Sequence, residues 1–281
     1  MVAEMTAEDS SKVEDFTQDP RWSDPVFREF IYASQQPTPP YLLQQLLTDD
    51  NAEVRESLAE SPDLTPELYS ALAEDHELKL VLALSPYTPP ELLTQLSTDA
   101  DAEVRLHAIH NENTPAEALE ALALSSEDRA ERMTALHHKN TPPEVLASLA
   151  SSPDEANRVI AGQHPNTPTV KVEQLATDPL WIVRASTARN PDCPPATLNT
   201  LSKDSETIVR RNTARNLKTP PASLVRLAAD PAPEVVRAAE KNPSYKKFRR
   251  WVADKAGIPA HAKPAVRERQ VDQILRKQFL S

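Results

Sequence analysis

A row of cationic side chains recurs along the chain at intervals of about 26 residues, and an acid stands six positions before several of them. A guanidinium can bind a carboxylate or a phosphate through two parallel hydrogen bonds. The row therefore has two interpretations. Each cation forms a salt bridge to the acid or a hydrogen bond to a nearby carbonyl, or the row is a line of arginines that binds phosphates. The cations are Arg55, Lys79, Arg105, Arg132, Arg158, Arg184 and Arg210, with Arg237 closing the series, and the acids are Asp49, Asp99, Asp178 and Asp204.

A second row lies five residues beyond the first and changes from acidic to basic along the chain. It comprises Glu60, Leu84, His110, His137, Gln163, Arg189 and Arg215. With Arg184, Arg210 and Arg211 nearby, its last members predict a positive ridge in the C-terminal half. Trp181 is the tryptophan within this half of the repeats, and we expect it to pack between repeats or to anchor a partner, since Trp and Arg are enriched at binding hot spots.

Metal binding and catalysis have little support in the sequence. A zinc site needs three or four ligands around one ion, and the central histidines, among them His107 and His110, do not form a His-Glu-x-x-His motif. No Gly-x-Ser-x-Gly, phosphate-binding loop or dinucleotide fingerprint occurs. We therefore expect no metal, no cofactor and no enzymatic activity. One enzyme-like alternative is action on DNA bases by Asp178 and Trp181 in a groove.

These side chains must be positioned by a repeat whose seams are Thr-Pro or Cys-Pro pairs. The pairs begin at Thr38, Thr65, Thr88, Thr114, Thr141, Thr167, Cys193 and Thr219. In each unit we expect Thr to cap a short helix that begins at proline and carries two apolar residues three apart, such as Leu93 and Leu96. A polar turn and a second helix with a Val-Arg pair follow. That helix is expected to close at Asn, Ser or His in the left-handed conformation, as at Asn111.

Helices of about 8–10 residues are too short to be stable alone, so neighbouring units must stack and share a core. Glycine is scarce, with two residues, whereas there are 27 prolines. Scarce glycine argues against strand-rich folds with tight hairpins. The pattern predicts an all-α solenoid of about eight two-helix repeats over residues 38–243.

The unit read from Thr88 to Arg105, Thr-Pro-Pro-x-x-Leu-Leu-x-x-Leu-x-x-Asp-x-x-x-x-Val-Arg, resembles the leucine-rich repeat variant family. It is similar, more distantly, to HEAT and armadillo repeats. The resemblance implies a right-handed superhelix of short helices, one of them possibly 3₁₀, and it implies no enzymatic activity. Some members of that family carry an iron–sulfur module with clustered cysteines, which one cysteine, Cys193, cannot provide.

Charge and composition divide the chain into three parts. Residues 1–37 form an acidic segment, with a capping helix expected at residues 24–34 in which Phe27, Phe30 and Ile31 face inward, and residues 1–15 are expected to be disordered. The repeats are acidic overall. Residues 244–281 hold ten Lys or Arg against three acids, and two helices are expected there, one from Tyr245 that stops at Gly257 and one from Pro264 to about Leu280.

Cys193 cannot form an intrachain disulfide, and we expect it to be a small residue at a helix start rather than a reactive thiol. The sequence begins without an apolar signal segment and contains no run of 18 apolar residues. A cytoplasmic protein without a transmembrane segment is expected, and its oligomeric state is left open.

The expected function is non-catalytic binding or scaffolding for a protein or peptide along one face of the repeats. The alternative is a nucleic-acid binder that uses the positive ridge and the basic C-terminal segment, either as a cap with a docked helix or as an interaction arm. The residues expected to carry binding are Trp181, Arg184, Arg189, Arg210, Arg211, Arg215, Lys246, Lys247, Arg249, Arg250 and Trp251.

Overall fold

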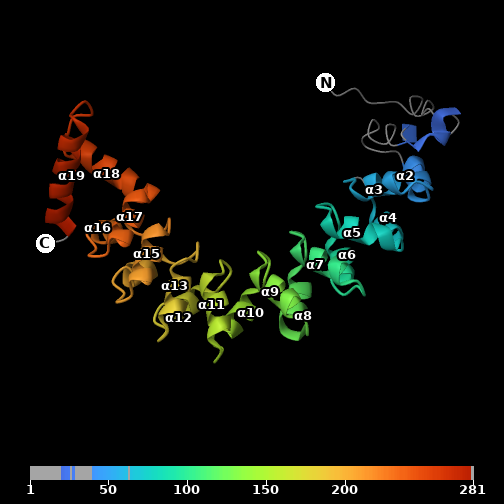
Figure 1. Ribbon diagram of the computed structural model, residues 1–281, viewed down its shortest axis with the longest axis horizontal. Helices are drawn as coiled ribbons and strands as arrows, with labels where there is room; N and C mark the ends of the chain where they lie inside the picture. The colour runs from blue at the N-terminus through green and yellow to red at the C-terminus, as the bar shows by residue number, and fades with distance from the viewer. Residues whose placement is uncertain (1–19, 26, 29–39, 63, 280–281) are drawn as a thin grey trace, which may run out of the picture. The chain divides into compact units, whose positions relative to one another are not determined.

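The computed structural model describes residues 20–279, apart from residues 26, 29–39 and 63 and the side chains of residues 40, 41 and 44. Every regular element in this part of the chain is a helix, and the repeats form eight helix pairs (Figure 1). The all-α repeat fold expected from the sequence is confirmed. The first helices are α2 (Pro40–Leu47), α4 (Pro66–Leu72), α6 (Pro90–Leu96), α8 (Ala116–Ser125), α10 (Pro143–Ala150), α12 (Thr169–Leu175), α14 (Pro195–Leu201) and α16 (Pro221–Leu227).

The Val-Arg pairs lie on the second helices. These helices pack directly on one another, as α5 does on α7 and α13 on α15. They are α3 (Ala52–Ala59), α5 (His76–Leu84), α7 (Ala102–His110), α9 (Arg129–His137), α11 (Glu155–Gln163), α13 (Trp181–Thr187), α15 (Thr207–Arg215) and α17 (Pro233–Lys241). The chain forms two compact units, residues 1–118 and 119–281, and the division falls within α8.

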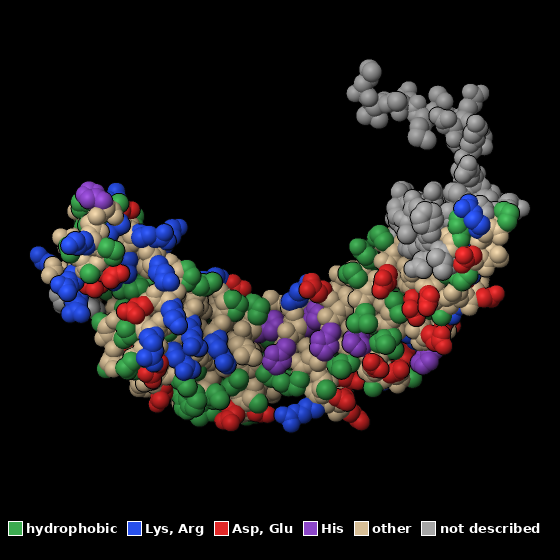
Figure 2. All heavy atoms as spheres, turned by 45° about the horizontal axis from the view of Figure 1, so that its top comes forward, with side chains coloured by type: hydrophobic (Ala, Val, Ile, Leu, Met, Phe, Trp, Pro, Cys, Tyr) green, Lys and Arg blue, Asp and Glu red, His purple; other side chains and the backbone are tan. Residues whose placement is uncertain are grey.

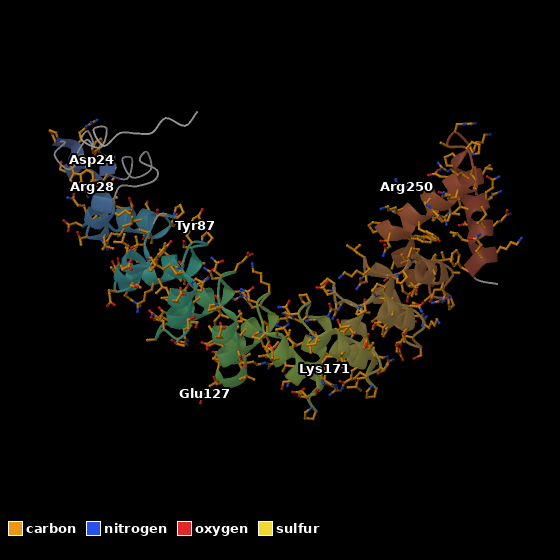
Figure 3. The ribbon with its side chains drawn as sticks, turned by 180° about the vertical axis from the view of Figure 1, so that it is seen from behind. Asp24, Arg28, Tyr87, Glu127, Lys171 and Arg250 are labelled. Carbon is orange, nitrogen blue, oxygen red and sulfur yellow. The ribbon has the colours of Figure 1, made fainter. Side chains whose placement is uncertain are left out.

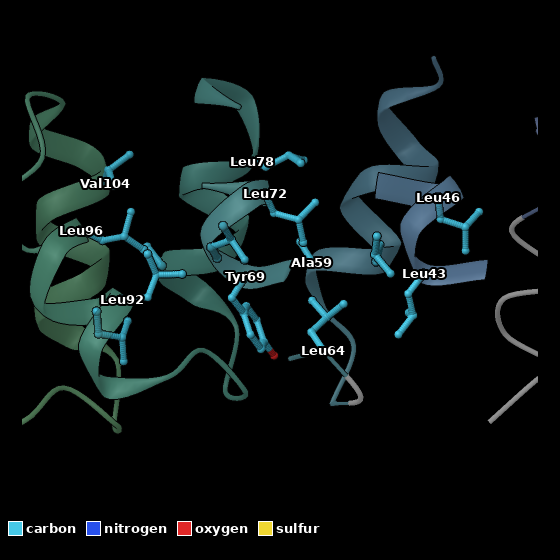
Figure 4. Close-up of a cluster of buried hydrophobic side chains, with 14 of the residues drawn as sticks. Leu43, Leu46, Ala59, Leu64, Tyr69, Leu72, Leu78, Leu92, Leu96 and Val104 are labelled. Carbon is cyan, nitrogen blue, oxygen red and sulfur yellow. The ribbon is translucent and has the colours of Figure 1, made fainter. Parts of the chain in front are cut away.

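The paired apolar residues form the core, as their spacing predicts. In the first unit, Leu43, Leu46, Leu93 and Leu96 are buried in one cluster (Figure 4). Trp22, within the 3₁₀ turn Pro20–Ser23, and Phe27 pack against the same cluster. The inward position expected for Phe27 is therefore confirmed, whereas Phe30, Ile31 and residues 1–15 lie outside the described residues.

Most seam residues do not play the capping role that we expect from the sequence. Thr65 does cap its following helix, accepting a hydrogen bond from the backbone N–H of Leu68. In α6, α10, α12, α14 and α16 the helix begins one residue later and its N-cap is a proline. The buried hydroxyl of Thr88 instead donates to the carbonyl of Leu82, six residues earlier. The threonine thus satisfies a carbonyl at the end of the preceding helix, as Thr141, Thr167 and Thr219 also do.

The prediction of left-handed asparagines is wrong, because no non-glycine residue in the described part of the chain has a positive φ. Asn216 is extended (φ −68°, ψ 130°) and buried. Its Nδ2 donates to the carbonyls of Ala188 (2.9 Å) and Asn190 (2.7 Å), and its Oδ1 accepts from the backbone N–H of Lys218. These bonds tie one repeat to the preceding one.

The same arrangement recurs along each unit, and we call it the amide ladder. Asn111 bonds to the carbonyls of Ala83 and Ser85 in the first unit. In the second unit Asn190 bonds to the carbonyl of His164, and Asn242 bonds to those of Ala214 and Asn216. A buried carbonyl without a partner is costly, and at these seams an asparagine supplies the donor from the following repeat.

Two further helices close the second unit. α18 (Pro243–Lys255) and α19 (Pro264–Phe279) pack on α16, and their Tyr245, Val252, Val271 and Leu275 are buried in one cluster with Leu224 and Leu227. Gly257 has φ +66° and ends α18: its N–H bonds to the carbonyl of Asp254, and that of Ile258 bonds to the carbonyl of Ala253. This is the Schellman arrangement that favours glycine.

Candidate functional site

The first cationic row forms an ion-pair ladder between successive repeats. Nε of Arg184 lies 2.7 Å from Oδ2 of Asp204, twenty residues later, and Nη2 lies 3.0 Å from Oδ1. The Nη1 of Arg184 donates to the carbonyl of Asp178, six residues earlier. The prediction that the row bonds turn acids and carbonyls is confirmed, and the acid belongs to the following repeat. The other pairs within the row are Arg55–Asp75, Lys79–Asp99, Arg158–Asp178 and Arg210–Asp230, and Arg28, ahead of the row, pairs with Asp49.

The ladder is mostly shielded from solvent, since the side chains of Arg184 and Asp204 are 15% and 8% exposed. Burial alone would raise the pKa of Asp204, but hydrogen bonds from Arg184 and from the backbone N–H of Glu206 lower it below the ordinary value. The pKa of Arg184 is raised by its hydrogen bonds to the same carboxylate. Arg184 and Arg210 are therefore engaged within the protein rather than presented to a partner.

Arg237 does not close this row, contrary to the sequence-based expectation. The position 26 residues after Arg210 is Val236, and Arg237 is in register with Arg211 of the preceding repeat. Arg237 is exposed, whereas Arg211 is half-buried and its Nε makes no hydrogen bond to the residues that the structure describes. The two arginines lie on the solvent side of α15 and α17.

Three side chains of the second predicted row, from successive repeats, contact one another. Nε2 of His137 lies 3.3 Å from Nε2 of Gln163, and Oε1 of Gln163 accepts from Nη2 of Arg189 at 3.4 Å. Arg189 and Arg215 are exposed near the C-terminal ends of α13 and α15. Lys241, 26 residues after Arg215 and also exposed, continues the row on α17, although the sequence analysis did not include it.

We call this surface of the second unit the cationic face and define it by two lines of side chains. The C-terminal row is Arg189, Arg215 and Lys241, and the middle row is Arg211 and Arg237. Figure 2 shows Lys and Arg side chains gathered over the second unit. Five cations repeated at equivalent positions give this face a net attraction for anions.

Trp181 lies at the surface with 45% of its area exposed, so it is not a buried core residue, and its role as an anchor for a partner stays a prediction. It begins α13, next to Ile182 (42% exposed), and Ile208 occupies the equivalent first turn of α15 (37% exposed). Exposed apolar residues thus lie one or two helical turns from the cationic face.

The basic C-terminal helices contribute a separate groove. A cavity of about 470 Å³ between α18 and α19 is lined by Lys246, Arg249, Arg250, Ala253, Arg267, Glu268 and Val271. Arg249 bonds to Asp272, and Arg267 bonds to Asp254. Lys247 and Trp251 are exposed, with Trp251 stacked on Phe248, and Arg250 projects from α18 (Figure 3).

One of the central histidines, His164, takes part in the amide ladder, whereas His110 and His137 bond carbonyls of their own helices. No group of three or more potential metal ligands occurs in the described ranges. His164 takes an asparagine position: its Nδ1 accepts from the N–H of Asn166, so its Nε2 carries the proton and donates to the carbonyl of His138 at 3.0 Å. Burial lowers the pKa of His164, and the nearby His137 and His138 lower it further.

Replacing His164 with Asn should remove a source of acid sensitivity. Because the folded-state pKa lies below the ordinary 6.5, the unfolded chain binds more protons in the interval between them. The His164 contribution to the free energy of unfolding is therefore constant above about pH 7 and decreases as the pH falls below 6.5. Asn keeps the amide-ladder bond but does not titrate.

Urea unfolding at pH 7.5 and 5.5 checks this, followed by tryptophan fluorescence in a Trp22→Phe background so that the signal comes from the second unit. The loss of stability on acidification should be smaller in His164→Asn than in the unchanged chain. Replacement of the exposed His261 by Asn serves as the control and should leave the loss in place. Equal losses in the unchanged chain and in His164→Asn would contradict the assignment.

Cys193 replaces a seam threonine and is fully buried, and burial raises the pKa of its thiol to about 12. Thiolate formation at neutral pH is therefore suppressed, which favours the expected packing role over a reactive thiol. In the described parts of the chain, no helix has both the length and the apolar character required to cross a bilayer.

Comparison with known proteins finds similarity to solved structures. No protein-family model matches the chain, and no curated protein matches it. Among solved structures, the chain is similar to one described as a leucine-rich repeat variant with a novel repetitive protein structural motif, at 24% identity and a TM-score of 0.44, over 72% of this chain and 81% of that one. That structure belongs to the family that the repeat unit resembles, and the likeness concerns the fold alone.

Proposed function

We propose that the protein is a non-catalytic binding or scaffold protein whose cationic face holds an acidic segment of a partner protein. One observation carries the proposal: Arg189, Arg215 and Lys241 are exposed at the same position of three successive repeats. Repetition of one cation at one position presents a line of charge, whereas the neighbouring Arg184 and Arg210 are neutralised by aspartates.

The apolar residues beside this line support a protein partner. Trp181, Ile182 and Ile208 are exposed, and contacts of a Trp or Ile with apolar side chains contribute affinity that charge alone does not give. The acidic balance of the rest of the repeats disfavours a long polyanion that would run past the second unit. A short acidic segment with apolar residues fits both features.

Charge reversal tests the proposal in the full-length chain. Proteins are captured from a native lysate, with and without nuclease, by the unchanged chain, by Arg189→Glu/Arg215→Glu and by the control Lys203→Glu/Lys255→Glu. We expect acidic proteins that survive nuclease, are lost with the first double variant and are retained by the control. Identical captured proteins for both variants would contradict the proposal.

A nucleic acid is the second candidate partner, and the groove between α18 and α19 favours it. The exposed Lys246 and Arg250 line this groove, and α18 also carries the exposed Lys247 and the stacked pair Phe248 and Trp251. Phosphate contacts by cations and base stacking on aromatic rings are the usual means of binding single strands. The affinity for a single-stranded oligonucleotide should fall steeply as salt rises, and a flat salt response would eliminate this candidate.

A further inference from the structure

The spacing of the cationic face constrains the partner beyond its charge. The second helices α13, α15 and α17 pack directly on one another, and equivalent residues of packed helices are about 8–10 Å apart. Arg189, Arg215 and Lys241 therefore form a line of three charges with this repeat distance, and Arg211 and Arg237 form a parallel line.

Of the extended conformations, polyproline II matches this distance. It has three residues per turn and rises about 3.1 Å per residue, so every third side chain lies on one face about 9 Å further along. A β-strand places same-face side chains about 7 or 13 Å apart, because they recur at every second residue. Neither of the β-strand spacings coincides with the repeat.

The width of the cationic face also favours an extended chain. Arg211 and Arg215 are four residues apart on α15, which corresponds to about 6 Å along the helix axis. An α-helix is about 10–12 Å across with its side chains and would extend beyond both cationic lines. Acids seven residues apart on a partner helix would match the distance between repeats. The helix itself, however, would be wider than the separation of the two cationic lines.

Other charges near the face define its limits. Glu234 on α17 occupies the position of Ile182 and Ile208, so the apolar line ends in an acid at the third repeat. Glu240 lines a cavity with Lys246 and Arg249 and lies three residues from Arg237 on α17, so it bounds the middle row at the third repeat. The exposed pair Lys218–Asp192 is mutually neutralised.

We infer that the cationic face of α13, α15 and α17 binds a polyproline II segment of a partner that carries Asp or Glu at every third position. This inference rests on the proposed function and adds the conformation and acid spacing of the partner. Each acid meets one member of the C-terminal row, and the residues between them contact the middle row.

Two peptides of identical composition and charge test the spacing against the full-length chain. One repeats Glu-Pro-Ala, which places an acid at every third residue. The other repeats Glu-Ala-Glu-Pro-Pro-Ala, in which the acids are two and four residues apart. We expect the first to bind about tenfold more tightly in fluorescence anisotropy, because three exposed ion pairs form in register. This preference should vanish in Arg189→Glu/Arg215→Glu and persist in Lys203→Glu/Lys255→Glu.

The possible failures are distinguishable. If neither acidic peptide binds, the proposed function itself fails. If both bind equally and both are lost in Arg189→Glu/Arg215→Glu, the face binds acidic segments but the spacing inference is wrong. If a helix-forming peptide with acids seven residues apart binds better than Glu-Pro-Ala repeats, the polyproline II assignment is overturned.

Discussion

Replacing Asn216 with Asp should lower the free energy of unfolding of the second unit by about 3 kcal/mol. The new side chain has the same shape and keeps the acceptor for the N–H of Lys218, but it loses both donors. The buried carbonyl of Ala188 then loses its side-chain amide partner, that of Asn190 keeps only the backbone N–H of Cys193, and both face a carboxylate. An unsatisfied buried polar group costs about 1–3 kcal/mol.

Urea unfolding measures this effect when it is followed by tryptophan fluorescence in a Trp22→Phe background, because Trp22 packs in the first unit whereas Trp181 and Trp251 lie in the second. The matched control is Asn157→Asp: Asn157 is half-buried on α11 and makes one side-chain bond, to the hydroxyl of Ser152. We expect the control to lose less than about 1 kcal/mol. A similarly small loss in Asn216→Asp would mean that the amide ladder does not hold the repeats together.

Removing residues 244–281 should have the second large effect, because α18 and α19 cover the last repeat. Tyr245, Val252, Val271 and Leu275 share a buried cluster with Leu224. Truncation exposes that apolar surface to water, and solenoid ends without a cap lose stability and solubility. We expect the truncated chain to aggregate or to unfold at a clearly lower temperature, as measured by light scattering and circular dichroism.

A milder pair of variants separates capping from loss of the whole segment. Leu275→Ala should destabilise the full-length chain by about 2–5 kcal/mol, because it leaves a cavity in a buried cluster. Gln278→Ala, at an exposed position of the same helix, should have little effect. If both the truncated chain and Leu275→Ala melt like the unchanged protein, the C-terminal helices are an interaction arm rather than a cap.

The repeat and its core could be predicted because their signals are local. The prolines and the apolar pairs such as Leu93 and Leu96 determine where each first helix begins and which side is buried. The ion pairs were also predictable, since only the turn offers carboxylates to the row that contains Arg184. What the sequence did not reveal is that each of these carboxylates belongs to the next repeat.

The hydrogen bonds of the seams were not predictable from local propensity. Asparagine tolerates the left-handed conformation, but the partners of Asn216 lie 26 and 28 residues away in the preceding repeat. The hydroxyl of Thr88 likewise points back to the preceding helix rather than forward. In both cases satisfying a buried carbonyl outweighs the usual local capping preference.

The candidate site was predicted in part. Counting back from the Thr-Pro seams placed Arg189 and Arg215 correctly. The last repeat, however, ends at Asn242-Pro243 and is not followed by a Thr-Pro pair. Arg237 was therefore assigned to the wrong row, and Lys241 was missed. Counting 26 residues from Asn216 to Asn242 would have found both. The exposure of Trp181 could not be anticipated, because periodicity does not distinguish a surface aromatic residue from a buried one at a helix start.

Arginine modification by phenylglyoxal, read by mass spectrometry on the full-length chain, tests the central claim most directly. Without peptide, Arg189, Arg215 and Arg237 should react, whereas Arg184 and Arg210 should resist because aspartates hold them. Saturating Glu-Pro-Ala peptide should protect Arg189 and Arg215 and leave the exposed Arg269 of α19 reactive. Protection of α19 with no change at Arg189 and Arg215 would show that the cationic face is not the binding surface.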